Sequence, residues 1–528
     1  MSSYALIINL PQILLPLYPL SFLLLFILFS IFLYKWLSSP KCNTTLHTPP
    51  PGPPKLPIIG NLHQLGKLPH RSLQSLSYKY GNLMLLYFGN RPTLVVASAS
   101  AAEEIIKSRE IFFLNRPKLR RFIDRIFYDA NDVGFSKYNE KWRYMKSICV
   151  TQLLSNKRVQ SFQSIREEEV SRMIEEIKSY GGSVLNLSEI VMKLAKGLIC
   201  RTALGRKFDD GRDGSGKDIY KLFKELTEVM GEISVGDYIP FLGWIDRLTG
   251  LEGRVEYVRK QFDEFIEEVV QEHELRVLRH GNIGYKKDDD GQNVNNFIEV
   301  LLEIQRENPA QISRESIKAV ILDIFGAGTD TTSTMLGWAM TELIRHPKIM
   351  KKLQGEVRDI LKTNTRVTED DLENMKYLKA VIKEILRLHP PVPLSVFRES
   401  SQNVKIDKYD IVANTQVMIN TWAMQRDPTY WQDPEIFHPE RFLNNPLCAD
   451  FKGQHFQFVP FGGGRRGCPG LSLATTTVEF VLASFVYEFN WSLPNGKEGY
   501  TLDIAESWGI SVRRQNPLMV VANPYSGN

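Results

Sequence analysis

The chain has 528 residues, of which 43% are hydrophobic and 24% are charged, with a formal net charge of +5. This is an ordinary globular composition, and the length allows a core large enough to enclose a cofactor. The five cysteines are few, odd in number and scattered, and no CxxC pair occurs, which argues against a disulfide scaffold. No basic stretch interleaved with aromatic residues indicates nucleic-acid binding, so we expect no nucleic-acid partner.

Residues 1–37 have the pattern of a membrane anchor. No charged side chain precedes Lys35, and Tyr18 to Leu37 is almost wholly apolar. About 20 apolar residues are enough to cross a bilayer as a helix. Lys35 and Lys41 follow the span, and the positive-inside rule then places the main body in the cytosol. The alternative is a cleaved signal peptide, which lacks its usual positively charged start here.

A proline-rich segment follows the predicted anchor. Thr48 to Pro57 contains six prolines and one glycine, a composition that makes a stiff, extended segment without helix. We therefore predict a hinge over residues 38–60 that joins the anchor to one catalytic domain, residues 61–528.

Two elements in the body stand out. Leu83 to Val96 is β-prone and is interrupted by Gly89-Asn90, which predicts a hairpin. Most of the remaining chain has a helical pattern. One long helix is predicted from Ser313, which can cap its start, to Pro347, which ends it.

The middle of this long helix breaks its pattern. Gly326 and Gly328 each weaken a helix by about 1 kcal/mol relative to alanine. They also remove side chains, so that a flat group can lie against the backbone. The polar pair Asp330 and Thr331 follows at once, inside an otherwise apolar helix.

The most informative stretch is the loop from Phe461 to Gly470. It places Cys468 among glycines and two arginines, between an aromatic-rich run and a helix-like run. Glycine allows the backbone to approach a flat, bulky group closely, and a thiolate is a strong, soft ligand for iron. Arg466 can pair with a carboxylate beside that group. Together these features indicate haem bound through a cysteine axial ligand.

The same loop also has an alternative interpretation. Gly462, Gly464 and Gly467 have the spacing of a dinucleotide-binding turn, and His455 to Val459 is a candidate for the preceding strand. The chain would then be a membrane-anchored nicotinamide oxidoreductase without haem. Too little chain remains beyond the loop for a doubly wound sheet, and Pro469 would fall inside the phosphate-binding helix.

The loop resembles the haem-binding signature of the cytochrome P450 family. The matching residues are Phe461, Gly464, Arg466, Cys468 and Gly470. Residues 327–332 are similar to the distal-helix signature of the same family, and the motifs match in order from the hinge to the C-terminus. The chain looks like a plant microsomal member that oxidises specialised metabolites. The resemblance implies a mainly α fold with small β-sheets, preceded by one transmembrane helix.

The resemblance also implies roles for individual residues. Cys468 would be the axial ligand of the iron of haem b, with Thr331 as the hydrogen-bonding alcohol and Asp330 as the acid in proton delivery. The residues expected to bind the haem propionates are Arg466, Arg398, Trp142 and Lys146. Lys146 departs from the arginine usual in the family, and an ammonium cannot bind a carboxylate in a fork.

A further match concerns a charged network. Glu384 and Arg387 lie three residues apart on a predicted helix, so they can share a face. They match the E-x-x-R element of the family, and Arg441 matches the arginine that joins this pair. The implied role is a structural network behind the haem pocket.

The implied reaction is the insertion of one oxygen atom from O2, with NADPH electrons delivered by a separate membrane-bound reductase. We expect a single-pass protein of the endoplasmic reticulum membrane that contacts lipid and faces the cytosol. The expected substrate is a small lipophilic plant metabolite such as a coumarin, an indole alkaloid or a terpenoid. Oxidative cyclisation or desaturation without retained oxygen stays open.

The resemblance places the substrate pocket among apolar and aromatic side chains. The residues expected to line it are Phe113, Phe122, Phe127, Leu394, Val396, Phe397 and Trp508.

Overall fold

The chain forms two compact units, Met1–Thr48 and Pro49–Asn528. The structure is a computed structural model that describes residues 48–118, 121–207, 219–232, 234–280, 295–362, 366–444, 451, 453–509 and 511–525, with Leu23, Phe26, Ile27 and Ser30 as single positions. The predicted anchor, residues 1–37, therefore lies almost wholly outside the described residues. In the part that is described, no helix combines the length and the apolarity needed to cross a membrane.

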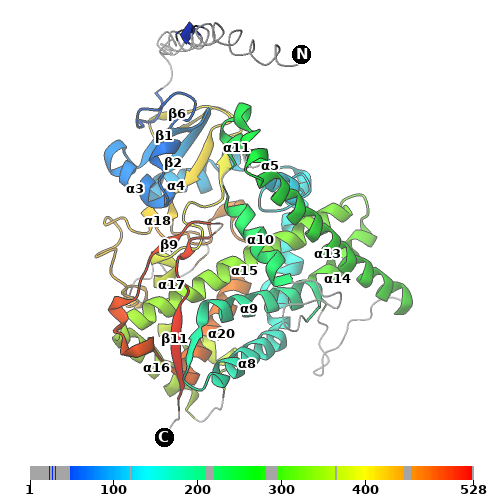
Figure 1. Ribbon diagram of the computed structural model, residues 1–528, viewed down its shortest axis with the longest axis vertical. Coiled ribbons are helices and arrows are strands. Elements are labelled where there is room, and N and C mark those ends of the chain that lie inside the picture. Colours follow the sequence, from blue (N-terminus) through cyan, green and yellow to red (C-terminus); the bar gives the residue numbers. More distant parts are fainter. Residues whose placement is uncertain are drawn as a thin grey trace, which may run out of the picture. The chain divides into compact units, whose positions relative to one another are not determined.

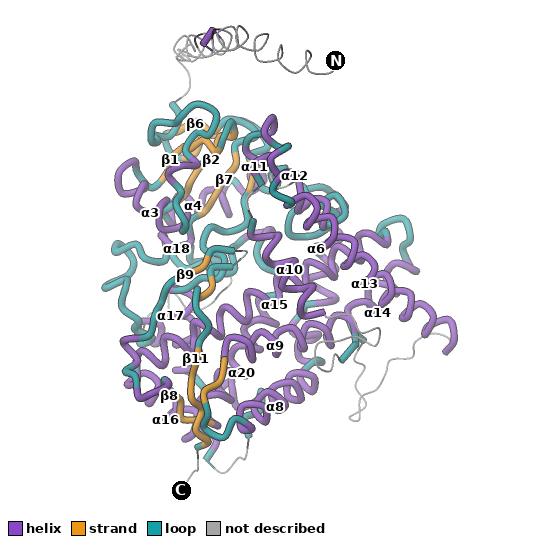
Figure 2. Tube along the Cα trace, in the orientation of Figure 1, coloured by secondary structure: helices purple, strands orange, loops and turns teal. Residues whose placement is uncertain are grey.

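Helices dominate the Pro49–Asn528 unit, as Figure 2 shows in purple. The longer ones are α3 (Pro69–Tyr80), α8 (Gln163–Ser179), α9 (Leu187–Ile199), α10 (Ile219–Gly231), α13 (Leu251–His280), α14 (Phe297–Glu307), α15 (Arg314–Arg345), α16 (Pro347–Leu361), α17 (Lys376–Leu388) and α20 (Leu471–Glu488). The shorter ones are α4 (Ala99–Glu103), α5 (Arg121–Ile126), α6 (Glu140–Ile148), α7 (Asn156–Ser161), α11 (Val235–Tyr238), α12 (Ile245–Leu248), α18 (Thr421–Met424) and α19 (Arg441–Asn444).

The strands form small sheets, so the prediction of a mainly helical fold with small sheets is confirmed. The strands are β1 (Leu83–Phe88), β2 (Arg91–Val96), β3 (Val184–Asn186), β4 (Arg398–Glu399), β5 (Val404–Ile406), β6 (Tyr409–Ile411), β7 (Gln416–Ile419), β8 (Phe489–Ser492), β9 (Glu506–Ser507), β10 (Arg513–Arg514) and β11 (Met519–Pro524). Their pairing orders are β1-β2-β7-β4, β3-β11-β8, β5-β6 and β10-β9.

The predicted hairpin is confirmed. Strands β1 and β2 pair antiparallel, with Leu83 opposite Val96 and Phe88 opposite Arg91, so that Gly89-Asn90 forms the turn. Gly89 has a φ of 60°, and an added Cβ would lie 2.0 Å from the carbonyl oxygen of Tyr238. Only glycine satisfies both constraints without strain.

The predicted long helix is also confirmed. Helix α15 has 32 residues, and the Ser313 hydroxyl accepts a hydrogen bond from the backbone N–H of Ser316 to cap its start. The helix passes through the middle of the unit, between the β1-β2 sheet and the group of α8, α9 and α20 (Figure 1). Phe325 packs in the core cluster of α13 and α14, whereas Leu336 packs in that of α17 and α20. Both halves of α15 are therefore part of the core, so a polar side chain that is buried on this helix needs a hydrogen-bond partner or a functional role.

The proline-rich segment packs against the hairpin from Pro51 onward. The backbone N–H of Leu85 donates to the Pro51 carbonyl at 2.9 Å. The Asn61 amide donates to the Pro54 carbonyl at 3.1 Å and accepts from the Tyr87 N–H at 2.8 Å. Proline has no N–H, so this segment cannot form a regular backbone hydrogen-bond ladder of its own. The carbonyl groups of Pro51 and Pro54 instead accept from the sheet edge and from one amide side chain.

Candidate functional site

Cys468 lies in a tight loop between the short 3-10 turn Gly464–Arg466 and helix α20. Its backbone N–H donates to the Phe461 carbonyl at 2.9 Å, and the Gly467 N–H closes the turn on Gly464 at 2.9 Å. The aromatic residue and the glycines predicted from the sequence therefore shape the backbone that presents the sulfur.

Gly464 is required by the packing of this loop. Its φ is 64°, and an added Cβ would lie 2.2 Å from a Glu110 carboxylate oxygen and 2.7 Å from the Ile106 carbonyl. At Gly470 an added Cβ would lie 3.8 Å from the Cys468 sulfur, which is ordinary contact. Gly464 thus fixes the path of the loop, whereas Gly470 leaves space beside the thiol.

The Cys468 side chain is exposed, yet the surrounding protein raises the pKa of its thiol by desolvation. A sulfur that is both accessible and surrounded by protein lies on an internal surface. The Gly470 N–H and the Lys146 ammonium act in the opposite direction and favour the thiolate. The ammonium of Lys146 donates to the Gly467 carbonyl at 2.6 Å, so this lysine braces the loop directly before the cysteine.

Three arginine side chains are buried close to this loop. Desolvation and then repulsion by Arg398 lower the pKa of Arg466 to about 9. Desolvation lowers the pKa of Arg398 to about 10. Desolvation, followed by repulsion from Arg466 and Arg398, also lowers the pKa of Arg116. The three guanidiniums therefore form one cluster in which desolvation and mutual repulsion disfavour the charged forms.

Most donors of this cluster bind backbone carbonyls. Arg466 donates to Leu114 at 2.8 Å and Ser136 at 2.7 Å. Arg398 donates to Gly463 at 3.1 Å, and its other terminal nitrogen is buried without a partner among the residues that the structure describes. Within the described residues, no carboxylate forms an ion pair with either arginine.

The donor set fits a dianionic group. Buried cations without counter-ions are strongly unfavourable, and a neighbouring pair of carboxylates would compensate them. The two propionates of a haem supply such a pair, and the accessible Cys468 thiol supplies a ligand for its iron. The residues present therefore fit the cofactor that the sequence predicts.

Trp142 supports the cluster from α6. Its indole N–H donates to the Val133 carbonyl at 2.9 Å, and the Arg466 guanidinium lies 4.0 Å above the ring centroid. This cation–π contact helps to hold Arg466 in place. The donors of Trp142 and Lys146 thus point to backbone carbonyls here, and their contact with a propionate stays a prediction.

Arg116 belongs to this cluster and was not found by sequence reasoning. It donates to the carbonyls of Gly134, Val396 and Phe397 at 2.7–2.9 Å. In the sequence it stands close to Lys118, Arg120 and Arg121, so it looks like one more solvated cation. The useful signal was the apolar run Phe112-Phe113-Leu114 just before it, which indicates that the chain enters the core there.

The middle of α15 carries a small accessible strip. Ala327 is exposed although the residues on either side in the helix are mostly buried. The Thr331 hydroxyl donates to the Ala327 carbonyl at 2.6 Å, one turn back. Asp330 instead accepts from the N–H and the hydroxyl of Ser511. The two predicted proton-delivery residues are therefore adjacent but have different partners in this state.

The predicted charged network is present. Arg387 donates to both carboxylate oxygens of Glu384, at 2.7 and 2.8 Å, and both side chains are completely buried. Arg441 adds a third contact to Glu384 at 3.1 Å. Arg387 also donates to the carbonyls of Gln425 and Pro434, so the network joins α17 to the segment that precedes α19.

The expected pocket lining is only partly accessible. Phe113 is fully buried in the cluster around β2 and β7, so it does not line an accessible surface. Phe122, Phe127 and Leu394 are likewise core residues. Val396 is 39% exposed, and Phe397 and Trp508 are half-buried, so these three side chains are the accessible part of the expected set. Sequence alone does not separate aromatic core from aromatic pocket.

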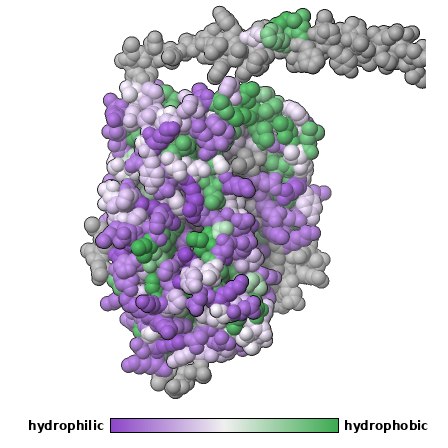
Figure 3. Space-filling view, turned by 60° about the vertical axis from the view of Figure 1, so that its left-hand side comes forward, coloured by the Kyte–Doolittle hydropathy of each residue, from purple (hydrophilic) through white to green (hydrophobic). Residues whose placement is uncertain are grey.

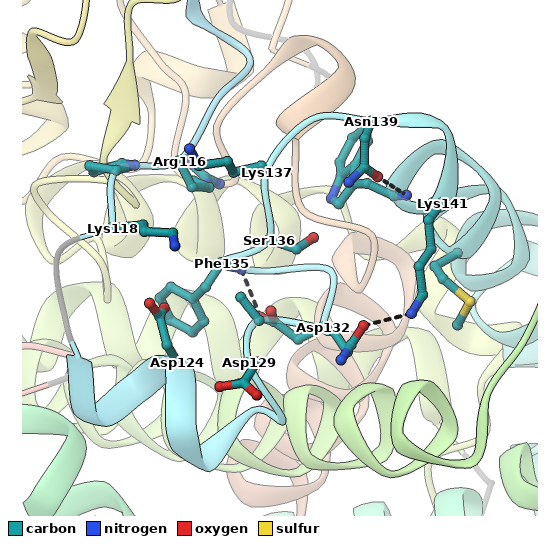
Figure 4. Close-up of a pocket in the computed structure, with 15 residues that line it drawn as sticks. Arg116, Lys118, Asp124, Asp129, Asp132, Phe135, Ser136, Lys137, Asn139 and Lys141 are labelled. Carbon is teal, nitrogen blue, oxygen red and sulfur yellow. Dashed lines mark hydrogen bonds between the residues drawn. The ribbon is translucent and has the colours of Figure 1, made fainter.

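A cavity of about 430 Å³ borders Arg116 and Trp142 (Figure 4). Asp132 lies on its wall and accepts from the Phe135 N–H at 2.7 Å. Asp323 of α15 accepts from the N–H groups of Val133 and Gly134 at 2.7 and 3.1 Å. This carboxyl pair joins the 132–135 loop to α15.

Burial raises the pKa values of both carboxyl groups of this pair. Desolvation, and then repulsion by Asp323, raises the pKa of Asp132. Desolvation raises the pKa of Asp323 to about 6, against the hydrogen bonds from the loop. The two groups therefore share a proton at a pH at which ordinary carboxyls are ionised.

The alternative nucleotide site is not supported by the fold. His455 to Val459 forms turns and irregular backbone, with no strand before the glycines. Among the described strands, only the pair β2 and β7 runs parallel. A dinucleotide-binding turn needs a strand directly before it in a parallel sheet.

Comparison with known proteins identifies the family. The family model described as Cytochrome P450 matches residues 50–521. The chain belongs to the cytochrome P450 family. Cytochrome P450 736A117 of Prunus mume is 50% identical over 511 residues, covering 96% of each chain. Psoralen synthase of Ammi majus is 45% identical and covers 94% of this chain and 96% of its own.

Solved structures show the same fold. A structure of a zebra fish cytochrome P450 with abiraterone superposes with a TM-score of 0.74 at 23% identity, covering 88% of this chain and 100% of the other. The protein is therefore a cytochrome P450 monooxygenase by family and has the P450 fold. The family implies a haem iron cofactor, in agreement with the donor set around Cys468.

The Glu384 network predicts a large loss on truncation. Glu384→Ala or Arg387→Ala leaves an uncompensated buried charge, so we expect about 3–5 kcal/mol of destabilisation and loss of haem incorporation. Haem content and chemical denaturation measure this. Lys352→Ala is the matched control, because its ion pair with Glu440 is exposed and worth at most about 1 kcal/mol. Either network variant recovered with normal haem content would contradict the assignment.

The carboxyl pair predicts a pH-dependent difference in stability. The folded state raises the pKa of Asp323, so protonation favours folding, and this contribution is lost as the pH rises through about 6. Asp323→Asn mimics the protonated group. Its stability relative to the unmodified protein should therefore increase by about 1–3 kcal/mol between about pH 5 and pH 8. A difference that stays constant across this range would exclude the shared proton.

Proposed function

We propose that this protein is a haem-thiolate monooxygenase of the endoplasmic reticulum membrane that oxidises a small lipophilic plant specialised metabolite. It uses O2 and electrons from NADPH, delivered by a separate cytochrome P450 reductase. Residues 1–37 form the anchor, residues 38–60 the hinge, and residues 61–528 the haem-binding catalytic domain.

The observation that carries the proposal is the combination of Cys468 with the arginine cluster. An accessible thiol on a glycine-shaped loop lies close to three buried guanidiniums, one of which has an unpartnered nitrogen. A metal-binding sulfur accounts for the accessible cysteine, and two carboxylates on the same ligand account for the cations. A structural cysteine in a turn explains neither feature.

Each residue then has a defined task. Cys468 would bind the iron, and Arg466, Arg398 and Arg116 would bind the propionates, while Trp142 and Lys146 hold Arg466 and the cysteine loop in place. When bound, the haem supplies O2 activation with electron push from the thiolate. Thr331 and Asp330 would supply protons for this reaction, and positioned proton transfer is worth about 10²–10⁴ in rate.

A second outcome of the same chemistry is oxidative cyclisation or desaturation, in which no oxygen stays in the product. A relative named psoralen synthase matches 94% of this chain, which keeps this outcome among the candidates. Product mass after reaction under labelled O2 separates the two outcomes. Coumarins, indole alkaloids and terpenoids are the substrate classes to screen in microsomes that contain the reductase.

Contact with lipid is supported by an apolar surface over α11 and α12. Phe241, Trp244 and Leu248 are 61%, 56% and 77% exposed. Exposed apolar groups of this size mark interaction sites in soluble domains. The turn at Gly89 contacts both Ile59 and Tyr238, so the exposed Leu56 and Ile58 extend this region. Figure 3 shows hydrophobic residues gathered at one end of the Pro49–Asn528 unit.

Replacement of the proposed ligand tests the function directly. Cys468→Ser should abolish the thiolate-type carbon monoxide spectrum of the reduced protein and reduce turnover at least about 10²-fold, because serine does not supply the thiolate electron push. Cys149→Ser is the matched control, since that buried thiol lies outside the loop. Unchanged turnover in Cys468→Ser, or protein that stays colourless with ample haem, would overturn the proposal.

The lipid contact has its own test. In vesicles with brominated lipid, the fluorescence contributed by Trp244 should be quenched, because its exposed ring would lie among the acyl chains. That contribution is the difference between the full chain and Trp244→Phe. Trp431→Phe reports a buried ring whose contribution should not be quenched. Equal Trp244 contributions in brominated and ordinary vesicles would contradict the assignment.

A further inference from the structure

The Asp330 carboxyl group is held by a segment far away in the sequence. Its Oδ2 accepts from the Ser511 backbone N–H at 3.2 Å and from the Ser511 hydroxyl, whereas its Oδ1 is buried with no partner in the described part of the chain. Ser511 lies between strands β9 and β10, 181 residues beyond Asp330. Only 3% of Asp330 is accessible, so bulk water does not replace these contacts.

The Ser511 hydroxyl has a second partner on α15. It lies 2.9 Å from the Thr334 hydroxyl, and either oxygen can act as the donor. When Asp330 is ionised, Thr334 donates to Ser511 and Ser511 donates to Asp330. When Asp330 is protonated, it donates to Ser511 and Ser511 donates to Thr334. Reorienting two hydroxyl hydrogens therefore satisfies both ionisation states of the carboxyl group.

We propose that Ser511, supported by Thr334, is the positioning residue for Asp330, holding the carboxyl group in place in both its protonated and its ionised form. This inference rests on the proposed function, in which Asp330 handles protons. Ser511 acts only through Asp330, and no proton leaves the pair of hydroxyls during the reorientation.

The surrounding contacts keep Ser511 in this place independently of Asp330. The Trp338 indole N–H donates to the Val512 carbonyl at 3.0 Å, and Arg514 donates to the Thr341 hydroxyl at 3.2 Å. The β9–β10 segment thus binds α15 at three places, through Ser511, Val512 and Arg514. Loss of the Ser511 hydroxyl should leave the contacts of Val512 and Arg514 with α15 intact.

The charges that face Asp330 come from two further elements. Desolvation raises the pKa of Asp330, while the Ser511 hydroxyl, Arg513 of β10 and Lys196 of α9 act in the opposite direction. Hydrogen bonds to a charged group are among the stronger ones in proteins. Removing the hydroxyl therefore shifts the balance toward the protonated carboxyl group.

The test is an infrared pH titration of the resting holoenzyme. The carboxylic-acid carbonyl band of Asp330 is the band that disappears in Asp330→Asn, and its midpoint gives the pKa without turnover. Ser511→Ala should move this midpoint up by about one pH unit. Ser511→Thr, which keeps the hydroxyl, should restore it. In turnover, Ser511→Ala should lower product formed per NADPH about threefold to tenfold.

Thr341→Val is the matched control, because it removes an α15 hydroxyl that binds the same segment but lies away from Asp330. Its midpoint should not move. An unchanged midpoint in Ser511→Ala, a shift of equal size in Thr341→Val, or the absence of a titrating Asp330 band would each overturn the inference. The carbon monoxide spectrum of each reduced variant distinguishes failure of the Ser511 inference from failure of the proposed function. If the proposed function is wrong, the unmodified protein itself will lack the thiolate-type spectrum.

Discussion

The burial of positive charge beside the Cys468 loop is the constraint on which the rest of the site depends. Arg116, Arg398 and Arg466 repel one another and are removed from water, and backbone carbonyls satisfy only part of their donors. Asp132 and Asp323 oppose part of this cost at Arg116, and a further anionic partner would stabilise the cluster. A ligand with two carboxylates would therefore complement the positive charge of this surface beside the Cys468 loop.

The sequence predicted those features whose cause is local. The hairpin follows from β-prone runs around Gly89-Asn90, and the long helix follows from the Ser313 cap and Pro347. The Cys468 loop was found because Gly464 must adopt a positive φ against Glu110, which leaves a visible glycine pattern. In each case the physical reason lies within a few residues, so it leaves a mark in the sequence.

Features that depend on distant contacts were not predictable in the same way. Arg116 is buried by the carbonyls of Gly134, Val396 and Phe397, which are far from it in sequence. Phe113 was expected in the pocket and lies in the core, because both environments select aromatic side chains. Asp330 was singled out from the sequence as a polar residue inside an apolar helix, but its partner Ser511 lies on another element.

The β9–β10 segment is fixed at both of its ends. Glu506 accepts hydrogen bonds from His70 and Arg71 of α3 on one side, and Ser511 to Arg514 bind α15 on the other. Side chains between these attachment points can change in size and polarity without moving either end. This short stretch can therefore vary while the contacts that hold Asp330 are kept.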